Sequence, residues 1–370
     1  MLDVNPDVNS DMKNDFLSDN SSGLCPEALD AIIQVRGGRA VAYGDDTETA
    51  RAIDGFRGLF GKVDVFFVPT GSAANTLALA SLTRPWQRIL CDEYSHLAND
   101  ESTGPELQTG CRVVPVMAQG RKLTPADLHD RDATLLRGVH HPAPGAVTIS
   151  NPTEFGEVYT PEEVAALAAA SHDLGYRIHV DGARFANAVA ALGCDPRALT
   201  VDAGIDALSF GGTKNGLALG EAVLLFPGQA HREAVASFPV LRKRAGHLLS
   251  KHRYVSAPFA AVLEDGAWVR HATWANDMAA RLSGGLRDAG FPARFRTEAN
   301  GVFVSLPQQV RDGLEAAGWG FYPFGDPSWD LSRFMTSFDT DADRVDALVR
   351  DAIAAGEARR RDGGRSGAYS

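Results

Sequence analysis

Chemically active side chains follow several stretches of this sequence that have the pattern of buried β-strands. Gly71 and Ser72 follow the apolar stretch DVFFVPT, and His96 follows QRILCDEYS. Asp181 comes directly after YRIHV, and Lys214 comes directly after DALSFGGT. Ligands of a parallel α/β sheet bind beyond the carboxyl ends of its strands. We therefore expect these side chains to surround one binding site.

The first of these positions suit an anion and a flat ring. Small residues such as Gly71 and Ser72 at a helix N-terminus let backbone N–H groups approach a phosphate. An ordinary turn between a strand and a helix favours the same residues. His96 can stack on an aromatic ligand or exchange a proton near neutral pH, although a lone histidine is also a common structural hydrogen-bonding group.

The later positions suit a ring cation and an aldehyde. Asp181 and Arg184, separated by Gly and Ala alone, form a candidate ligand clamp, with a helix-capping aspartate as the alternative. Gly211 and Gly212 are expected to leave room for a flat group beside Lys214, and a lysine amine shielded from water loses its proton readily for attack on a carbonyl. A surface lysine is the alternative. A phosphate, an aromatic ring, a ring cation and an aldehyde together describe pyridoxal 5′-phosphate (PLP).

The elements that must position these residues alternate between strand and helix from about residue 47 to residue 226. Several strands are continuous apolar runs, which is typical of a mostly parallel sheet covered on both faces. After about residue 228 the pattern changes to long helices with a few strands, which predicts a smaller α+β domain. We expect a disordered extension over residues 1–15, an N-terminal arm and PLP-binding large domain over 16–255, a small C-terminal domain over 256–357 and a disordered tail over 358–370.

The composition is that of a globular protein, with 44% hydrophobic and 22% charged residues. The net charge of −11, from 36 basic and 47 acidic residues, argues against a nucleic-acid or membrane partner. The four cysteines are scattered without CxxC spacing, so we expect reduced thiols and no metal site. The polar N-terminus and the lack of a long apolar run predict a cytoplasmic protein.

Longer segments of the chain resemble the L-threonine aldolase family, in the β-eliminating lyase group of fold type I PLP-dependent enzymes, and most closely its low-specificity bacterial type. The resemblance spans about residues 16–355 and is carried by FLSDN (16–20), AYGDD (42–46), PTGSAAN (69–75), DEYSHLANDE (92–101), HVDGARFANA (179–188), SFGGTKNG (209–216), EANGVFV (298–304) and SRFMTSFDT (332–340). It implies an aspartate-aminotransferase-like α/β large domain with a mostly parallel sheet, and a smaller α+β C-terminal domain.

The resemblance also implies roles for the residues at the strand ends. Lys214 would bond covalently to the cofactor aldehyde. Asp181 would pair with the ring nitrogen, and His96 would stack on the ring near the substrate hydroxyl. Gly71 and Ser72 would hold the phosphate.

Further matches concern the substrate. Arg184 would bridge the cofactor's phenolate side and the substrate carboxylate, which Ser18 and Arg333 would also hold. His140, in GVHHPAPGA, matches a family histidine near the hydroxyl, with His141 as the alternative match.

The family is homo-oligomeric, so the resemblance implies a homodimer or a homotetramer. Tyr43, Arg242 and Lys251 match segments that reach the cofactor site of a neighbouring subunit. The chain departs from the family at NPTEFGE (151–157), where many members carry NT followed by a glycine pair. We expect this loop to influence which aldehyde is accepted.

The activity that the resemblance implies is reversible cleavage of L-β-hydroxy-α-amino acids, such as L-threonine, L-allo-threonine and phenylserine-like compounds, to glycine and an aldehyde. Either His96 or His140, or a water that they hold, would take the hydroxyl proton. A PLP-dependent transaldolase or a β-eliminating lyase of the same fold would use the same cofactor residues. A non-catalytic binding protein with a PLP fold is a more remote alternative.

Overall fold

The structure is a computed structural model that describes residues 16–136 and 138–363, with side chains described up to residue 357. It divides into two compact units. The large unit is Gly23–Arg270, and the small unit combines the described residues 16–22 with 271–363. The extension predicted over residues 1–15 lies outside the described residues.

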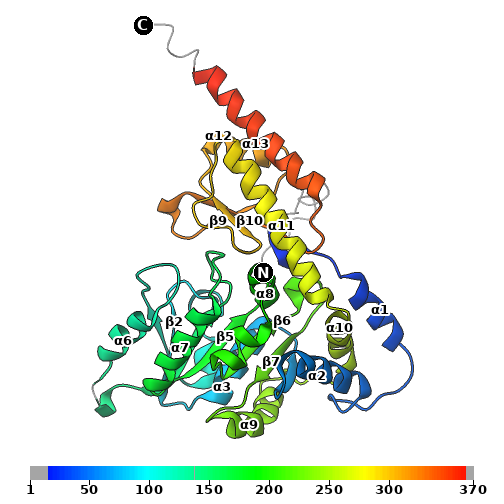
Figure 1. Cartoon of the computed structure of the whole chain (residues 1–370), viewed down its shortest axis with the longest axis vertical. Coiled ribbons are helices and arrows are strands. Elements are labelled where there is room, and N and C mark those ends of the chain that lie inside the picture. The colour runs from blue at the N-terminus through cyan, green and yellow to red at the C-terminus, as the bar shows by residue number, and fades with distance from the viewer. Residues whose placement is uncertain (1–15, 137, 364–370) are drawn as a thin grey trace. The chain divides into compact units, whose positions relative to one another are not determined.

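A seven-stranded sheet forms the centre of the large unit (Figure 1). Its strand order is β1-β7-β6-β5-β4-β2-β3, in which β7 is antiparallel to both of its neighbours and the other pairs are parallel. This arrangement confirms the predicted α/β class. The strands are β1 (Asp64–Val68), β2 (Gln87–Asp92), β3 (Arg112–Val116), β4 (Ala143–Ser150), β5 (Arg177–Gly182), β6 (Ala207–Gly211) and β7 (Glu221–Leu225).

Helices connect these strands and cover the sheet (Figure 1). They are α1 (Pro26–Val35), α2 (Thr47–Phe60), α3 (Gly71–Leu82), α4 (His96–Asn99), α5 (Gly104–Thr109), α6 (Pro125–Ala133), α7 (Pro161–Asp173), α8 (Phe185–Leu192), α9 (His231–Arg244) and α10 (Arg253–Glu264). Short 3₁₀ turns include η3 (Gly138–His140) and η6 (Thr213–Asn215). Helix α3 begins where the Thr70 side chain accepts a hydrogen bond from the backbone N–H of Ala73. Most of its residues are buried, so the residues at its N-terminus have a fixed position beside the sheet.

An aromatic cluster joins α10 to the sheet of the large unit. The ring of Phe259 lies 5.7 Å from that of Phe56 and 5.3 Å from that of Phe67, measured between centroids. Such packing buries a large apolar area. Residues 256–270 therefore belong to the large unit, and the domain boundary predicted after residue 255 is wrong.

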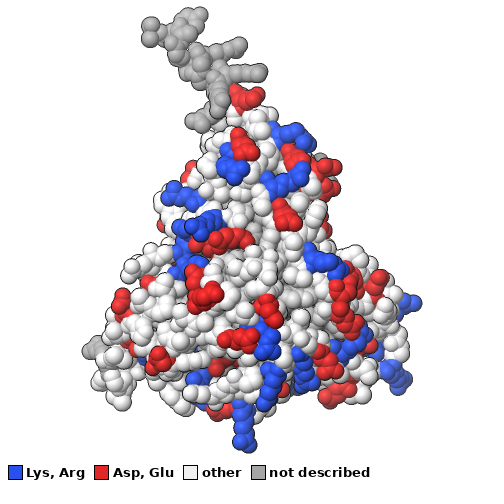
Figure 2. All heavy atoms as spheres, in the orientation of Figure 1, with Lys and Arg blue, Asp and Glu red and all other residues white. Residues whose placement is uncertain are grey.

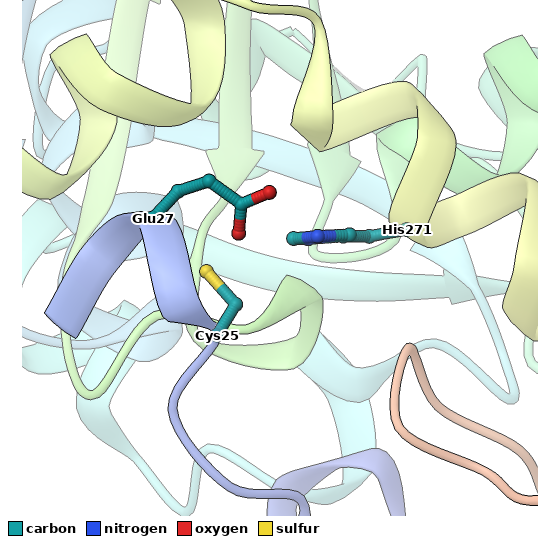
Figure 3. A group of neighbouring side chains, drawn as sticks. All are labelled: Cys25, Glu27 and His271. Atoms are coloured by element: carbon teal, nitrogen blue, oxygen red, sulfur yellow. The ribbon is translucent and has the colours of Figure 1, made fainter. Parts of the chain in front are cut away.

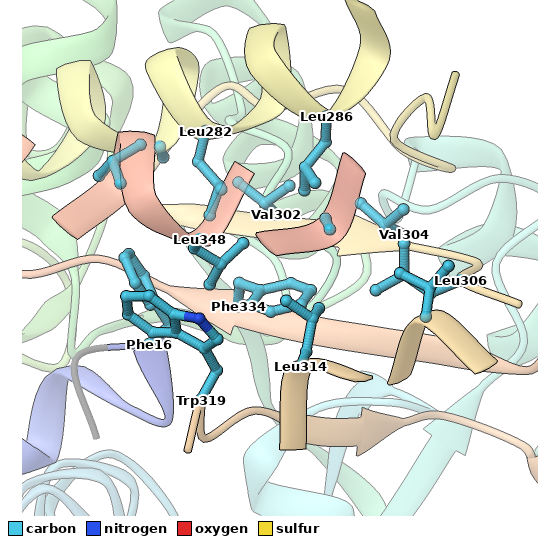
Figure 4. Packing of buried hydrophobic residues seen from close by; sticks show 14 of the residues in the cluster. Phe16, Leu282, Leu286, Val302, Val304, Leu306, Leu314, Trp319, Phe334 and Leu348 are labelled. Carbon is cyan, nitrogen blue, oxygen red and sulfur yellow. The ribbon is translucent and has the colours of Figure 1, made fainter. Parts of the chain in front are cut away.

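The small unit has its own antiparallel sheet and core. The sheet has the order β8-β10-β9. Its elements are η2 (Asp19–Ser21), β8 (Gly301–Val304), α12 (Gln308–Ala316), β9 (Tyr322–Phe324), η7 (Pro327–Trp329), β10 (Leu331–Met335) and α13 (Ala342–Gly363), together with most of α11 (Ala267–Asp288). Leu282, Val302 and Phe334 are among the core residues in Figure 4.

The segment from residue 16 to residue 22 groups with this small unit. Phe16 is fully buried, and its ring centroid lies 5.7 Å from that of Trp319 (Figure 4). The assignment of this segment to the large domain is therefore wrong. Helix α13 extends to Gly363, so the predicted tail is helical over 358–363, and its remaining residues lie outside the described part.

The charged residues of the surface and the cysteines can be compared with the sequence-based expectations. On the face that Figure 2 shows, basic and acidic side chains are interspersed. All four cysteines are free, as predicted. Among the described residues, no helix combines the length and the apolar content needed to cross a membrane.

Candidate active site

Strands β1, β2, β4, β5 and β6 all run in the same direction, so their carboxyl ends meet at one edge of the sheet. Asp181 lies in the middle of this edge, where it pairs in register with Ser150 of β4 and Ser209 of β6. Lys214 follows β6, and His96 follows β2. The chain thus brings these three predicted site residues to the same edge.

Asp181 is half-buried and has a hydrogen bond on each carboxylate oxygen. Its Oδ2 accepts from the side-chain amide of Asn75, at 2.8 Å. Its Oδ1 accepts from the backbone N–H of Ala183, at 3.0 Å. Each oxygen keeps a free lone pair, so this carboxylate can accept a further donor such as a protonated ring nitrogen.

His96 is paired with a buried carboxylate that the sequence analysis did not single out. The imidazole Nδ1 lies 2.9 Å from Oε1 of Glu101, whose side chain is fully buried. This hydrogen bond raises the pKa of His96, against the opposing effect of burial, and the negative charge of Asp181 raises it further. Because an ionised carboxylate only accepts, Nδ1 donates, and the lone pair of Nε2 is left to accept a proton.

A second buried carboxylate holds the turn that carries Lys214. Oε2 of Glu221, the first residue of β7, accepts a hydrogen bond from the backbone N–H of Gly212, at 2.6 Å. Burial raises the pKa of Glu221 to about 7. A lone acidic residue at the start of the apolar stretch EAVLLF was the pattern that could have indicated this role.

Gly211 and Gly212 have a structural role that differs from the predicted one, which was to leave room for a flat group beside Lys214. A Cβ atom at Gly211 would lie 2.1 Å from the carbonyl oxygen of Ala183, and one at Gly212 would lie 2.5 Å from that of Gly220. The space beside Gly211 is filled by the backbone of Ala183, and the space beside Gly212 is filled by the Gly220 carbonyl and by the side chains of Phe259 and Leu217. The prediction that they clear room for a cofactor ring is therefore wrong: they allow close packing of neighbouring chain segments.

Gly211→Ala is expected to lower the free energy of unfolding by about 3 kcal/mol or more, because the new methyl group collides with backbone that cannot move independently. Chemical denaturation of both proteins measures this difference. Gly37→Ala is the matched control, since a Cβ at Gly37 has no atom within 4 Å. Equal stability of the Gly211 and Gly37 variants would contradict the packing role.

Loop 151–157, where the sequence departs from the family, contributes another acidic residue. The Ser150 hydroxyl donates to Oε1 of Glu154, at 3.4 Å. The carboxyl of Glu154 interacts electrostatically with Asp181, Arg184, Lys214 and His96. Burial, with a contribution from Asp181, raises its pKa. The departure in sequence thus places an extra carboxyl among the predicted site residues.

Three further predicted cofactor contacts of the large unit lie at the N-terminal ends of two helices. Gly71 and Ser72 begin α3, with open space around Gly71. Arg184 precedes α8, directly beyond β5. A backbone hydrogen bond connects the segment that follows β6 with the segment before α1. The N–H of Cys25 (Figure 3) donates to the carbonyl of Gly216, at 2.8 Å.

Two of the residues predicted to reach a neighbouring subunit lie near one another. Tyr43 is half exposed, and its N–H donates to the carbonyl of Ser250, at 3.0 Å, beside the exposed Lys251. Arg242 is instead buried and donates to the carbonyl of Phe67, at 3.0 Å. Burial lowers the pKa of Arg242.

The structure does not bring His140 to this site within one chain. His140 is exposed in η3, just before the amino end of β4, whereas Asp181 lies at the carboxyl end of the parallel strand β5. The length of β4 separates the two ends by roughly 25 Å. His140 therefore does not lie near His96 within one chain, and the same geometry applies to His141. The role of either histidine near the substrate hydroxyl stays a prediction.

The two other predicted substrate contacts belong to the small unit. Ser18 precedes η2, and its side chain accepts from the N–H of Asn20, at 3.2 Å. Arg333 is half-buried on β10, with its guanidinium carbon 5.7 Å from the ring centroid of Tyr322. Their binding role stays a prediction.

Comparisons with known proteins agree with this arrangement. The model of the beta-eliminating lyase family matches residues 15–309. The low-specificity L-threonine aldolase of Pseudomonas sp. (strain NCIMB 10558) is 45% identical, over 93% of this chain and 99% of its own length. The enzyme of the same name from Pseudomonas aeruginosa is also 45% identical, over 92% and 98%.

Solved structures share the fold of this chain. The threonine aldolase of Leishmania major superposes with a TM-score of 0.84 at 25% identity, covering 91% of this chain and 97% of that one. A serine palmitoyltransferase structure that contains PLP shares the fold, with a TM-score of 0.66 at 16% identity over 93% and 87%. The chain belongs to the β-eliminating lyase family and, within it, to the low-specificity L-threonine aldolases.

Proposed function

We propose that this protein is a PLP-dependent carbon–carbon lyase that cleaves L-β-hydroxy-α-amino acids, such as L-threonine and L-allo-threonine, reversibly to glycine and an aldehyde. The observation that carries the proposal is the placement of Asp181, His96 and Lys214 at one sheet edge, in a chain 45% identical to low-specificity L-threonine aldolases. A homodimer or homotetramer in the cytoplasm is part of the same proposal.

The residues at this edge fit PLP. Asp181 has acceptor capacity left on both oxygens, and Lys214 supplies an amine beyond the next strand. Helix α3 directs the N–H groups at its start, including those of Gly71 and Ser72, toward the same edge, which suits a phosphate. When bound, PLP supplies an aldehyde for the substrate amine and a protonated ring that accepts the electrons of the broken Cα–Cβ bond.

The protein's own residues then have distinct tasks. Asp181 holds the ring nitrogen's proton in place. Nε2 of His96 accepts the proton of the β-hydroxyl, and Glu101 stabilises the imidazolium that results. Arg184 binds the substrate carboxylate, and the amine of Lys214 moves protons at Cα. Ser18 and Arg333 are proposed as further carboxylate contacts on the strength of the family resemblance.

The test is to incubate the purified holoenzyme with a panel of L- and D-β-hydroxy-α-amino acids and to measure aldehyde and glycine. We expect release of both, in equal amounts, from the L-compounds. Release that depends on an added acceptor aldehyde would favour a transaldolase instead. Formation of ammonia and a keto acid would favour β-elimination, and failure to bind PLP would favour the non-catalytic alternative.

Glu101→Gln is expected to shift the acidic limb of the pH profile of kcat/KM to lower pH, by about one unit. His96 must be neutral to accept a proton, so activity rises as the pH passes its pKa, which the Glu101 hydrogen bond raises. Glu106→Gln, at an exposed position of α5, is the control. An unchanged limb in the Glu101 variant would exclude His96 as the proton acceptor.

A further inference from the structure

The side-chain amide of Asn75 lies between Asp181 and the pair formed by His96 and Glu101. Nδ2 of Asn75 is 2.8 Å from Oδ2 of Asp181 and 2.9 Å from Oε1 of Glu101. The same Glu101 oxygen accepts from Nδ1 of His96, at 2.9 Å. His96, Glu101, Asn75 and Asp181 therefore form one continuous hydrogen-bonded chain.

The geometry of this chain depends on the chemistry of an amide. An asparagine NH₂ group has two N–H donors, and here each one points to a different carboxylate. Asn75 is 3% exposed, and its Oδ1 and the Oε2 of Glu101 are buried without a hydrogen-bond partner among the described residues. Two carboxylates in such a site are costly without a shared donor, and Asn75 supplies it from the first turns of α3.

We propose that Asn75 is a positioning residue that links the carboxylate facing the cofactor ring to the histidine that accepts the substrate proton. The roles of the two ends rest on the proposed function. The amide holds Asp181 and Glu101 at a fixed separation, and Glu101 in turn fixes the ring orientation and tautomer of His96. Removing the amide is therefore expected to change the pKa of His96 through Glu101, while the His96 residue itself is unaltered.

The first experiment uses the protein without its cofactor. ¹⁵N–¹H NMR titration of the histidine rings gives the pKa and the tautomer of His96, whose signals are identified with His96→Gln. In Asn75→Ala, Oε1 of Glu101 loses one donor, so its charge acts more strongly on the imidazolium. We expect the pKa of His96 to rise by on the order of one unit, the scale of one hydrogen bond to a charged group.

Within the described part of the chain, four charged groups act on His96, and they determine the direction in which its pKa shifts. They are Glu101 in the loop after α4, Asp181 on β5, Lys214 after β6 and Glu154 in the loop after β4. Asn75→Ala alters none of their formal charges. A shift therefore reports the lost hydrogen bonds.

Thr76→Ala is the matched control. Thr76 is the next residue of α3, is equally buried, and bonds through its hydroxyl to the carbonyl of Ser72 in the same helix. Loss of the Thr76 hydroxyl removes a hydrogen bond within α3 but leaves the hydrogen bonds among His96, Glu101, Asn75 and Asp181 in place. We expect the pKa of His96 in this variant to stay near the wild-type value, and an equal shift in both variants would overturn the proposal.

The second experiment uses the holoenzyme and Asn75→Asp, which keeps the size of the side chain but can donate at most one hydrogen bond, and only when protonated. We expect kcat/KM for glycine release to fall about tenfold or more in both Asn75 variants, which corresponds to about 1.4 kcal/mol or more. Wild-type kinetics in Asn75→Asp would overturn the proposal. Absence of aldehyde release in the wild type would refute the proposed function alone, because the NMR result does not depend on turnover.

Discussion

Lys214→Ala is expected to remove the yellow absorbance of the protein with its cofactor and to lower the rate of glycine release by roughly 10³-fold or more, the scale of losing a covalent catalytic group. The reason is that the amine of Lys214 is placed beyond the carboxyl end of β6, beside Asp181 and His96. Absorption spectra and single-turnover kinetics with L-threonine measure the two effects.

Lys214→Arg separates covalent attachment from charge. Arginine keeps the positive charge but does not lose its proton to act as a nucleophile. We expect it to be as inactive as alanine while its thermal stability stays closer to wild type, because the turn around it is held by the hydrogen bond between Glu221 and Gly212. Appreciable turnover in either variant would show that another amine carries the reaction.

Asp181→Asn is expected to retain cofactor binding but to lower kcat by about 10²-fold or more, which corresponds to two pKa units of lost stabilisation of a ring proton. The replacement also disturbs its own neighbours. An asparagine has one acceptor oxygen, so it satisfies the amide of Asn75 or the N–H of Ala183, but not both as Asp181 does. Kinetics and absorption spectra of the holoenzyme report the two consequences.

Asp92→Asn is the control for removing a charge at the same sheet edge. Asp92 ends β2 and accepts from the N–H of Tyr94, and burial raises its pKa to about 6. We expect its spectrum to match the wild type. If Asp181→Asn were as active as this control, the electron-accepting role assigned to the ring beside Asp181 would be wrong.

The order of strands and of the residues that follow them could be predicted from the sequence. A largely apolar run such as AVTI (146–149) identifies a buried parallel strand, because such strands are covered on both faces, and β4 is parallel to both of its neighbours. Once the strands are parallel, residues that follow them must meet at one edge. The grouping of Asp181, His96 and Lys214 follows from these local patterns.

Other features could not be predicted because they depend on contacts between distant segments. The assignment of residues 256–270 to the large unit depends on Phe259 packing against Phe56 and Phe67. The failure of His140 to reach the site depends on the direction of β4, since a histidine before a parallel strand lies at the opposite edge from one that follows it. A match to a family segment does not show at which edge a residue lies.

By itself, then, the sequence determined which chemical groups lie at the carboxyl edge, because local apolar patterns define the strands and each group immediately follows one. Only the tertiary structure decided how these groups are connected. Asn75 and Asp181 are 106 positions apart, and a hydrogen bond between them requires α3 to lie against the sheet. The purpose of Gly211 was decided in the same way, because the space beside a glycine is filled by whichever backbone the fold brings there, here that of Ala183.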